Sequence, residues 1–214
     1  MTTRPGAGRP TREQAEARQA QLLDRALDHF LEKGFEQATI EAIAQDVGMT
    51  KRTVYNRYPD KVSLFRAALN LAIERYSVTP EQLATTDCGD IEQTLIAIAK
   101  LRVGAVMTPN GLRLQRIVNT ESYRFPDIFG IAFEAGTLPS VKFLASILRR
   151  ETEAGRLTLP HPTKAALAFM GMVVSGPVRM LVSGNPLPQS EVDDGIAFAV
   201  RLFLDGARSR ADTT

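Results

Sequence analysis

The feature that most constrains this chain is a pair of short helical segments separated by a glycine-containing turn, within residues 39–61. Ala44, Gly48 and Val54 have the spacing at which two helices can cross closely. The small residue allows the contact, glycine adopts positive φ in the turn, and valine fills the crossing. Thr50 precedes the second segment and has the hydroxyl expected of its N-cap. This layout is typical of a helix-turn-helix that reads DNA.

The distribution of charge supports a small polyanion-binding module within an otherwise neutral chain. The 214 residues have a formal net charge of +2. Residues 13–46 carry three Lys or Arg and eight Asp or Glu, whereas residues 47–66 carry five Lys or Arg against Asp60 alone. From residue 77 onward the two signs balance at 14 each. A local basic segment of this kind predicts contact with phosphates of a nucleic acid.

The pattern along the rest of the chain predicts an all-α fold, because apolar residues recur at helical spacing and no strand-length alternation or internal repeat is present. We expect helices at about 11–34, 40–47, 51–57, 60–76, 90–107, 110–122, 126–135, 140–154, 163–184 and 190–209, with breaks that include a loop at 77–89 and the segment 136–139. The domain prediction is a disordered basic arm at 1–10, a three-helix DNA-binding bundle at 11–58, a connecting helix at 59–76, and a larger helical domain for dimerisation and ligand binding at 77–214.

Other classes of function find little support. A single cysteine, Cys88, excludes an intramolecular disulfide and a Cys-rich metal cluster, and favours a reducing cytoplasm. No run of about 18 apolar residues predicts a transmembrane helix, and no secretory signal is recognised, so no membrane partner is expected. His29 and His161 belong to no cluster with metal-ligand spacing, and Glu151 and Glu153 are interpreted as surface charges. The sequence contains no glycine-rich phosphate loop and no Gly-x-Ser-x-Gly nucleophile elbow. We therefore expect no enzyme, no metal and no cofactor.

Residues 22–65 resemble the N-terminal domain of TetR/AcrR-type transcriptional regulators. The matching motifs are Phe30-x-x-x-Gly34-Phe35-x-x-Ala38-Thr39, Ile43-Ala44-x-x-Val47-Gly48-Met49-Thr50 and Val54-Tyr55-x-Arg57-Tyr58-Pro59-x-Lys61-x-x-Leu64. Thr50, Arg57 and Tyr58 replace the commoner Ser, His and Phe. The C-terminal part is similar to the AefR-like subgroup through Leu112-Arg-Leu114-x-x-Ile117-x-x-x-Glu121-x-x-Arg124-Phe125-Pro126 and the stretch 166–184. The resemblance implies a dimeric regulator, usually a repressor, that responds to a small ligand.

The start of the second helix is predicted to read base edges. Lys51 and Arg52 can donate to guanine, Thr53 offers a methyl or hydroxyl group, and Asn56 can reach adenine or a phosphate. The resemblance places Tyr55 and Lys61 on the phosphate backbone. A cation at the start of a helix, as at Lys61, opposes the macrodipole unless a phosphate lies nearby. The candidate DNA-binding residues are Thr39, Thr50, Lys51, Arg52, Thr53, Tyr55, Asn56, Arg57 and Lys61.

Three of these interpretations leave alternatives open. Arg57 can equally be a solvated charge, and Tyr58 is expected to fill the core of the small domain more than to touch DNA. The arm with Arg4, Arg9 and Arg12 can lie in a minor groove, although a solvated tail is the simpler expectation.

The C-terminal half supplies candidates for dimerisation and for ligand binding. The last two predicted helices carry apolar faces, from which we predict dimer contacts by Phe169, Val173, Ile196, Val200 and Phe203. An intramolecular core can account for part of both faces. The candidate ligand-binding residues are Met107, Leu114, Glu121, Phe125, Phe129, Phe133, Phe143, Met170 and Val173, and the candidate polar groups beside them are Arg113, Arg116, Asn119, Glu121 and Tyr123. An apolar stripe is also what a plain core requires.

The sequence as a whole predicts a cytoplasmic, sequence-specific DNA-binding regulator. Its expected partners are a double-stranded DNA operator, a second copy of the chain and a small-molecule effector. The expected mode is a homodimeric repressor that a small apolar or amphipathic ligand releases from a palindromic operator. The alternatives are a transcriptional activator and an architectural DNA-binding protein without a ligand.

Overall fold

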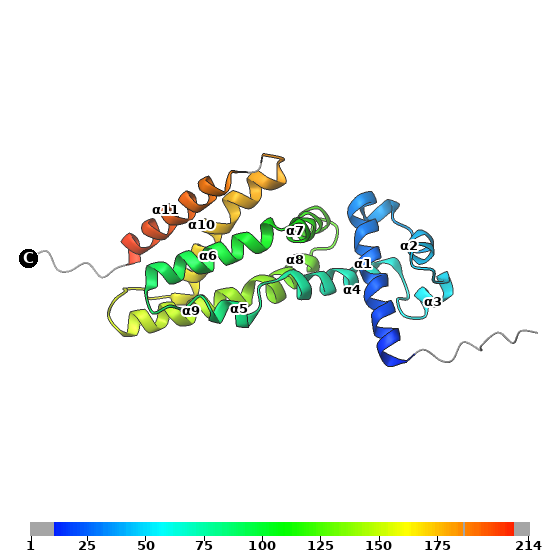
Figure 1. The fold of residues 1–214 in the computed structure, drawn as a ribbon, viewed down its shortest axis with the longest axis horizontal. Helices are drawn as coiled ribbons and strands as arrows, with labels where there is room; N and C mark the ends of the chain where they lie inside the picture. Colours follow the sequence, from blue (N-terminus) through cyan, green and yellow to red (C-terminus); the bar gives the residue numbers. More distant parts are fainter. Residues whose placement is uncertain (1–10, 186, 208–214) are drawn as a thin grey trace, which may run out of the picture. The chain divides into compact units, whose positions relative to one another are not determined.

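The computed structural model describes residues 11–185 and 187–207, and the predicted arm at 1–10 lies outside them. Within these residues the chain is helical and contains no β-strand, which confirms the predicted all-α class (Figure 1). The helices are α1 (Arg12–Gln37), α2 (Ile40–Asp46), α3 (Lys51–Tyr55), α4 (Lys61–Tyr76), α5 (Pro80–Ala84), α6 (Ile91–Met107), α7 (Pro109–Glu121), α8 (Asp127–Ala132), the π-helical turn η1 (Phe133–Thr137), α9 (Leu138–Glu153), α10 (Pro162–Val182) and α11 (Gln189–Ala207).

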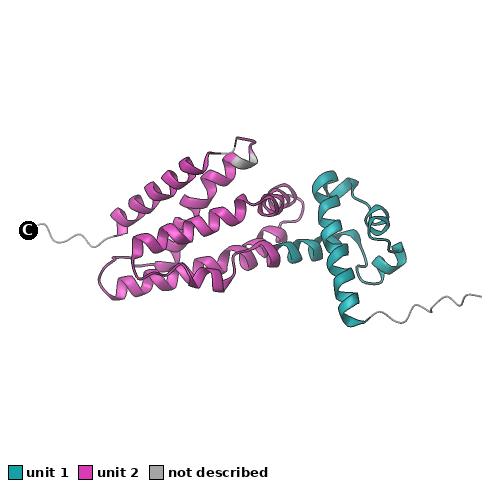
Figure 2. Cartoon of the chain, in the orientation of Figure 1, with its two compact units in different colours: residues 1–72 teal, residues 73–214 magenta. Residues whose placement is uncertain are grey.

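The chain forms two compact units, one up to Ala72 and one from Ile73 onward (Figure 2). The division lies inside α4, which therefore contributes residues to both units. The segment 77–89, predicted to be a loop, contains the short helix α5. Its N-cap Thr79 accepts a hydrogen bond from the Gln82 N–H, and the Gln82 side chain accepts one from the Thr79 N–H. Pro80 occupies the first turn of α5, where proline is tolerated, so it starts a helix here and does not break one.

The N-terminal unit is held together by an apolar core. Its residues from α1 recur at helical spacing and are buried: they are Leu22, Leu23, Ala26, Leu27 and Phe30. The rings of Phe30, Phe35 and Phe65 form a cluster with centroid separations of 5.7, 4.9 and 5.3 Å. Gly34 has φ of 73°, so the chain leaves the regular helix there, at the end of the helix predicted over 11–34. The cluster fixes α1 against the beginning of α4.

The C-terminal unit surrounds one core formed by α6, α9, α10 and α11. Its largest fully buried side chains are Phe169, Leu95, Ile98, Ile128 and Leu144, together with Leu83 and Ile73. The predicted break at 136–139 is absent, because η1 connects α8 to α9 and the Leu138 N–H donates to the Phe133 carbonyl. Pro139 lies in the first turn of α9, at the change from the π-helical turn to the α-helix.

One continuous helical stretch, Asp127–Glu153, is long and apolar enough to cross a membrane by length and composition alone. This differs from the expectation that no such run exists. A single stretch of this kind does not by itself indicate a transmembrane helix, because the core helix of a globular domain passes the same test of length and composition. Here Val141, Leu144 and Leu148 are buried in the core of the C-terminal unit. Packing within the chain therefore accounts for these three apolar residues of α9.

Candidate nucleic-acid interface and internal cavity

Two capped helices and a tight turn build the helix-turn-helix. The Thr39 hydroxyl accepts the Ala42 N–H at 3.2 Å, and the Thr50 hydroxyl accepts the Thr53 N–H at 3.1 Å. The N-cap predicted at Thr50 is thus confirmed, and Thr39 caps α2 in the same way. Gly48 has φ of 65°, and the following N–H, of Met49, donates to the Ala44 carbonyl at 2.8 Å. The turn therefore has the geometry for which its glycine was predicted.

The crossing of α2 and α3 is filled by the residues that the spacing indicated. Ala44 and Val54 are buried, and so is Tyr58 just after α3. The Tyr58 hydroxyl accepts a hydrogen bond from Gln19 Nε2 of α1 at 3.1 Å. Tyr58 is therefore a core residue, as the preferred interpretation held. The same Gln19 side chain accepts a hydrogen bond from Arg57 Nη1 at 3.4 Å, so Arg57 is exposed but has a partner.

The exposed side of α3 presents the predicted donors together. Lys51, Arg52, Thr53, Tyr55 and Asn56 are all exposed. Thr53 shares a hydrogen bond of 2.8 Å with the Thr50 hydroxyl, which orients both threonine side chains. The Arg52 guanidinium has no hydrogen-bonding partner among residues 11–185 and 187–207. Arg52 is thus the donor most accessible to a base edge.

Lys51 differs from Arg52, because its ammonium group already has a partner. It forms an ion pair with Glu41 of α2 and lies 5.5 Å from the centre of the Tyr55 ring. The hydrogen bond with Glu41 raises the pKa of Lys51, and the same bond lowers the pKa of Glu41. Both side chains are more than half exposed, so the pair is screened by water. If Lys51 contacts DNA, its ammonium group exchanges the Glu41 carboxylate for a group of the DNA.

Lys61 lies apart from the α3 donors and has a structural role that the sequence did not indicate. Its Nζ donates to the carbonyls of Glu36 and Ala38 at 3.0 and 3.2 Å and lies 4.5 Å from the centre of the Phe35 ring. The preceding Asp60 accepts the Ser63 N–H at 2.7 Å, and this bond with Ser63 lowers the pKa of Asp60. These contacts explain a cation in the first turn of α4 without a phosphate. Its predicted phosphate contact remains a prediction.

The C-terminal unit contains a cavity of about 150 Å³ between α6, α7, α8 and η1. Of the predicted ligand residues, Leu114, Phe129 and Phe133 line it. The others do not: Met170 and Val173 are core residues, Phe143 and Met107 pack against that core, and Glu121 and Phe125 lie outside the cavity wall. Helical spacing identified apolar positions correctly but could not tell the lining of a cavity from the lining of a core.

Arg102 of α6 is the one charged group in the cavity wall, and the sequence interpretation missed it. Its side chain is 7% exposed, and its Nη1 donates to the Gly136 carbonyl in η1 at 3.1 Å. The polar groups predicted instead were Arg113, Arg116, Asn119, Glu121 and Tyr123, of which none lines the cavity. The signal was present, since Arg102 follows Leu95 and Ile98 at helical spacing and so falls on the buried face of α6.

The residues predicted to form a dimer interface lie in the core of their own chain. Phe169, Val173, Ile196 and Val200 are almost fully buried, and the Phe203 ring lies edge-on to Phe169 at 5.2 Å. Phe169, Val173, Ile196 and Val200 cannot supply contact area to a second copy unless that core opens, so their choice is corrected. Phe203 is only partly buried, and its predicted dimer contact stays a prediction. Among the described side chains of the same two helices, the exposed large apolar ones are Leu167, Met172, Met180, Phe198 and Leu202.

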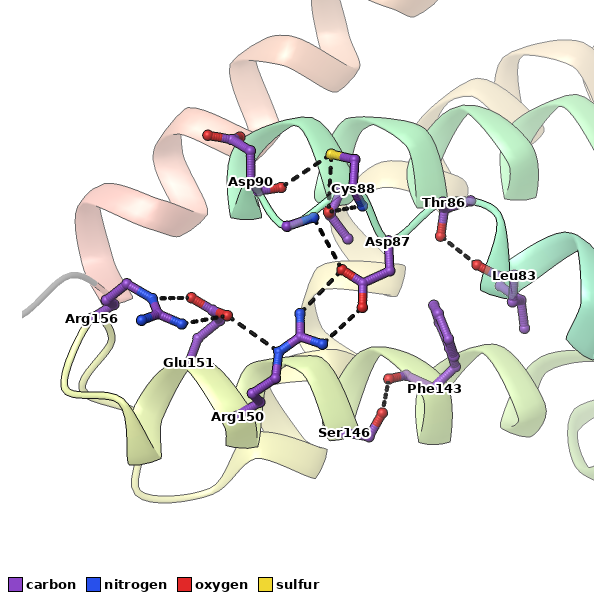
Figure 3. Close-up of polar contacts among 12 residues, drawn as sticks. Leu83, Thr86, Asp87, Cys88, Asp90, Phe143, Ser146, Arg150, Glu151 and Arg156 are labelled. Atoms are coloured by element: carbon purple, nitrogen blue, oxygen red, sulfur yellow. Dashed lines mark hydrogen bonds and ion pairs between the residues drawn. The ribbon is translucent and has the colours of Figure 1, made fainter.

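An ionic network ties the connection before α6 to the end of α9 (Figure 3). Arg150 donates to both oxygens of Asp87 at 2.8 and 3.1 Å, and these bonds lower the pKa of Asp87. Glu151 is 3% exposed and lies between Arg156, at 2.6 Å, and Arg150, at 3.4 Å. Glu151 was expected to be a surface charge, and that expectation was wrong. Cys88 beside the network is exposed, and no cluster of three potential metal ligands occurs in the described part of the chain.

Comparisons with known proteins agree along most of the chain. Residues 22–68 match the family model of bacterial regulatory proteins of the tetR family, and residues 93–206 match the C-terminal domain of AefR-like transcriptional repressors. An HTH-type transcriptional repressor of Mycobacterium tuberculosis is 24% identical over 186 residues, which cover 86% of this chain and 94% of that protein.

Solved structures show the same fold. A protein of Mesorhizobium loti assigned to the TetR family superposes with a TM-score of 0.78 at 22% identity and covers 94% of this chain and 100% of its own. The flavonoid-responsive regulator FrrA superposes with a TM-score of 0.73 at 24% identity, covering 92% of this chain and 100% of its own.

Proposed function

The chain belongs to the TetR family of bacterial regulatory proteins and is a DNA-binding transcriptional regulator, and on that premise we propose that it is a homodimeric repressor released from its operator by a small ligand. The observation that carries the proposal is the exposed row of donors on α3. Two capped helices and the Gly48 turn hold this row on a rigid surface. DNA in the cytoplasm is the partner that such a surface fits.

In the proposed complex α3 enters the major groove. Arg52 and Lys51 donate to base edges, whereas Tyr55 and the N-terminus of α2 at Thr39 contact phosphates. One such helix reads only a few base pairs, so useful specificity requires two copies on adjacent half-sites. This requirement is the physical reason for the proposed dimer and for a palindromic operator.

The proposed dimer contact uses the exposed faces of α10 and α11. On α10 these faces carry small residues that let a second helix approach closely, and on α11 they carry two exposed large apolar side chains separated by one turn. The small residues are Ala168, Gly171 and Ser175 of α10, which lie beside the exposed Met172. The large apolar side chains of α11 are Phe198 and Leu202. When such side chains are buried against a second copy of the chain, their apolar surface is removed from water, and this removal stabilises the dimer.

The proposed ligand binds in the cavity of the C-terminal unit. α4 supports a route from this cavity to DNA, because the helix begins at Lys61 in the N-terminal unit and its last turn supplies Ile73 and Tyr76 to the cavity wall. The response of FrrA to flavonoids supports a small organic effector for a chain of this fold. A ligand lowers the affinity for DNA only if it binds the conformation that does not bind DNA more tightly than the conformation that does.

Selection from random duplex DNA tests the proposal. The purified chain is incubated with the duplex pool and the retained sequences are read. We expect a two-fold symmetric motif whose half-sites are spaced by about one helical turn. Salt-sensitive binding without any enriched motif would contradict sequence-specific repression and support an architectural role. A reporter placed behind the selected motif then separates repression from activation.

A further inference from the structure

The guanidinium of Arg102 is buried, charged and incompletely bonded. Its only hydrogen bond to another described residue is the one from Nη1 to the Gly136 carbonyl, and its Nε is buried without any partner. No carboxylate pairs with it within residues 11–185 and 187–207. Burial lowers the pKa of Arg102, with no opposing contribution from an acidic neighbour. An arginine nevertheless stays protonated in proteins.

A buried charge of this kind is costly, because removal from water costs several kcal/mol unless a counter-ion and hydrogen bonds compensate. Arginines are almost never fully buried without a pair. The compensating anion is therefore to be sought in the space that Arg102 lines. That space is the cavity, whose wall contains no Asp or Glu.

The rest of the cavity wall is suited to a small ring. Leu114, Val118, Phe129 and Phe133 supply apolar and aromatic surface. The volume of about 150 Å³ equals that of an engineered cavity known to accept a benzene ring. The π-helical turn η1 forms one side, and such turns often occur at functional sites. The cavity wall therefore combines one cationic group with aromatic and apolar surface.

We propose that the cavity binds a small aromatic monocarboxylic acid, with its carboxylate paired to Arg102 and its ring against Leu114, Phe129 and Phe133. The planar guanidinium fork matches a carboxylate in shape and charge. The acid is the effector of the proposed repressor, and in that respect the inference rests on the proposed function. The binding site itself does not depend on it.

Calorimetric titration of the full chain with benzoate and with benzamide tests the site, because the two probes share a ring and differ in charge. We expect benzoate to bind at least tenfold more tightly than benzamide. Arg102→Met should abolish this preference and leave benzamide almost unchanged, whereas Arg102→Lys should retain part of it. The matched control is Arg149→Met, since Arg149 is exposed on α9 and does not line the cavity.

Three results would overturn the proposal: equal affinities for the two probes, unchanged benzoate affinity in Arg102→Met, or no binding of benzoate at millimolar concentration. Loss of folding does not confuse the result, because replacing an uncompensated buried charge by Met should keep or raise the unfolding temperature of the empty protein. A lower unfolding temperature in Arg102→Met would itself contradict an uncompensated charge.

Operator release distinguishes this inference from the proposed function. If benzoate binds and displaces the protein from the selected DNA motif, both stand. If benzoate binds but DNA binding is unchanged, the site stands and its role as the effector site fails. If the chain selects no DNA motif, the proposed repressor fails, while the calorimetric comparison still decides whether Arg102 holds a carboxylate.

Discussion

At the scale of single residues, neighbouring cations of the helix-turn-helix differ in what they already contact. Arg52 is without a partner in the described part of the chain, Lys51 is paired with Glu41, and Lys61 is bonded to two carbonyls. Sequence alone ranks all three as DNA contacts. The structure separates them into a free donor, a donor that must exchange partners, and a cation with a structural role.

Arg52→Ala is expected to reduce sequence preference more than general DNA affinity. A lost bidentate contact to a base costs about 1–3 kcal/mol of discrimination. Fluorescence anisotropy on the selected motif and on random duplex measures both affinities. Arg18→Ala on the exposed part of α1 is the control. Equal losses on the two duplexes would show that Arg52 contacts phosphate and not a base.

Lys61→Met is expected to lower the free energy of unfolding, by about 1–3 kcal/mol, because two charge-assisted hydrogen bonds to the Glu36 and Ala38 carbonyls are lost. Lys51→Met is the matched comparison, since its exposed ion pair contributes little to stability. Urea denaturation monitored by circular dichroism measures both variants. If both lysine variants unfold at the same urea concentration as the wild type, the carbonyl contacts of Lys61 are not stabilising.

At the same scale, the sequence predicted what local chemistry determines and missed what distant segments determine. The caps at Thr39 and Thr50 and the turn at Gly48 follow from neighbours within a few residues. The carbonyl contacts of Lys61 come from a segment more than 20 residues earlier. The environment of Arg102 comes from a turn more than 30 residues later. No spacing rule reaches across such distances.

At the scale of helices, the sequence predicted most of the elements and misjudged two proline-containing segments. α5 was missed because Pro80 was interpreted as part of a loop, and the α8–α9 connection was predicted to break at Pro139. Proline kinks or breaks a helix from its interior but fits the first turn, and the local sequence alone does not reveal which turn a proline will occupy. The continuous path through η1 is what brings the Gly136 carbonyl to Arg102.

Two glycines are expected to respond to alanine for different reasons. Gly48→Ala should cost about 1–2 kcal/mol, because the backbone is left-handed there but a Cβ meets no atom within 4 Å. Gly111→Ala should cost more, since its Cβ would lie 2.2 Å from the Ala105 carbonyl oxygen at the junction of α6 and α7. Gly104→Ala, inside α6 with open space around its Cβ, should gain up to about 1 kcal/mol.

Chemical denaturation of the three glycine variants measures these differences in the free energy of unfolding. A smaller loss for Gly111→Ala than for Gly48→Ala would mean that the turn between α6 and α7 adjusts easily. That result would contradict a close backbone approach at Gly111.

The network at the end of α9 should make stability depend on pH in acid. Arg156 and Arg150 lower the pKa of Glu151 below its ordinary 4.5, so the folded state binds this proton less readily than the unfolded state. The stabilisation is complete above about pH 4.5 and is lost as pH falls through the lowered pKa. Glu151→Gln should therefore destabilise the protein at neutral pH and flatten the acid decline.

The expected loss for Glu151→Gln at pH 7 is about 1.5 kcal/mol, the low end for hydrogen bonds to charged groups, because the Arg156 side chain is 60% exposed and stays hydrated. Glu153→Gln is the control, since Glu153 is exposed on the same helix. Thermal unfolding between pH 3 and 7 checks both. If the unfolding temperature of Glu151→Gln fell with decreasing pH in parallel with that of the wild type, protonation of Glu151 would not contribute to the loss of stability in acid.

At the scale of the whole molecule, amphipathicity predicted that α10 and α11 carry apolar faces but not what covers them. The strongest apolar face of α11 contains Ile196, Val200 and Leu204, and it covers the core of the same chain. Phe198 and Leu202 lie on another face and are 60% and 55% exposed. A helical pattern reports burial, and the fold decides whether burial is achieved within one chain or between two.

The double substitution Phe198→Ser with Leu202→Ser is expected to give a folded monomer, because both side chains are removed from the proposed interface and not from the core. Sedimentation velocity at micromolar protein measures the change in mass. Tyr123→Ser, which removes an aromatic ring that is 94% exposed away from α10 and α11, should leave the dimer intact. Ile196→Ser should instead unfold the chain. A monomeric wild type would end the proposal of a dimer.

The uncompensated charge of Arg102 has a consequence for the lifetime of the protein in the cell. A ligand that binds only the folded state raises its stability by mass action, and cellular proteases act on the unfolded fraction. A regulator that holds its acid is therefore degraded more slowly than an empty one. If the proposed repressor is released by this acid, withdrawal of the acid returns the protein to its operator and at the same time shortens its half-life, so that the amount of regulator, and not only its occupancy of DNA, follows the supply of the acid.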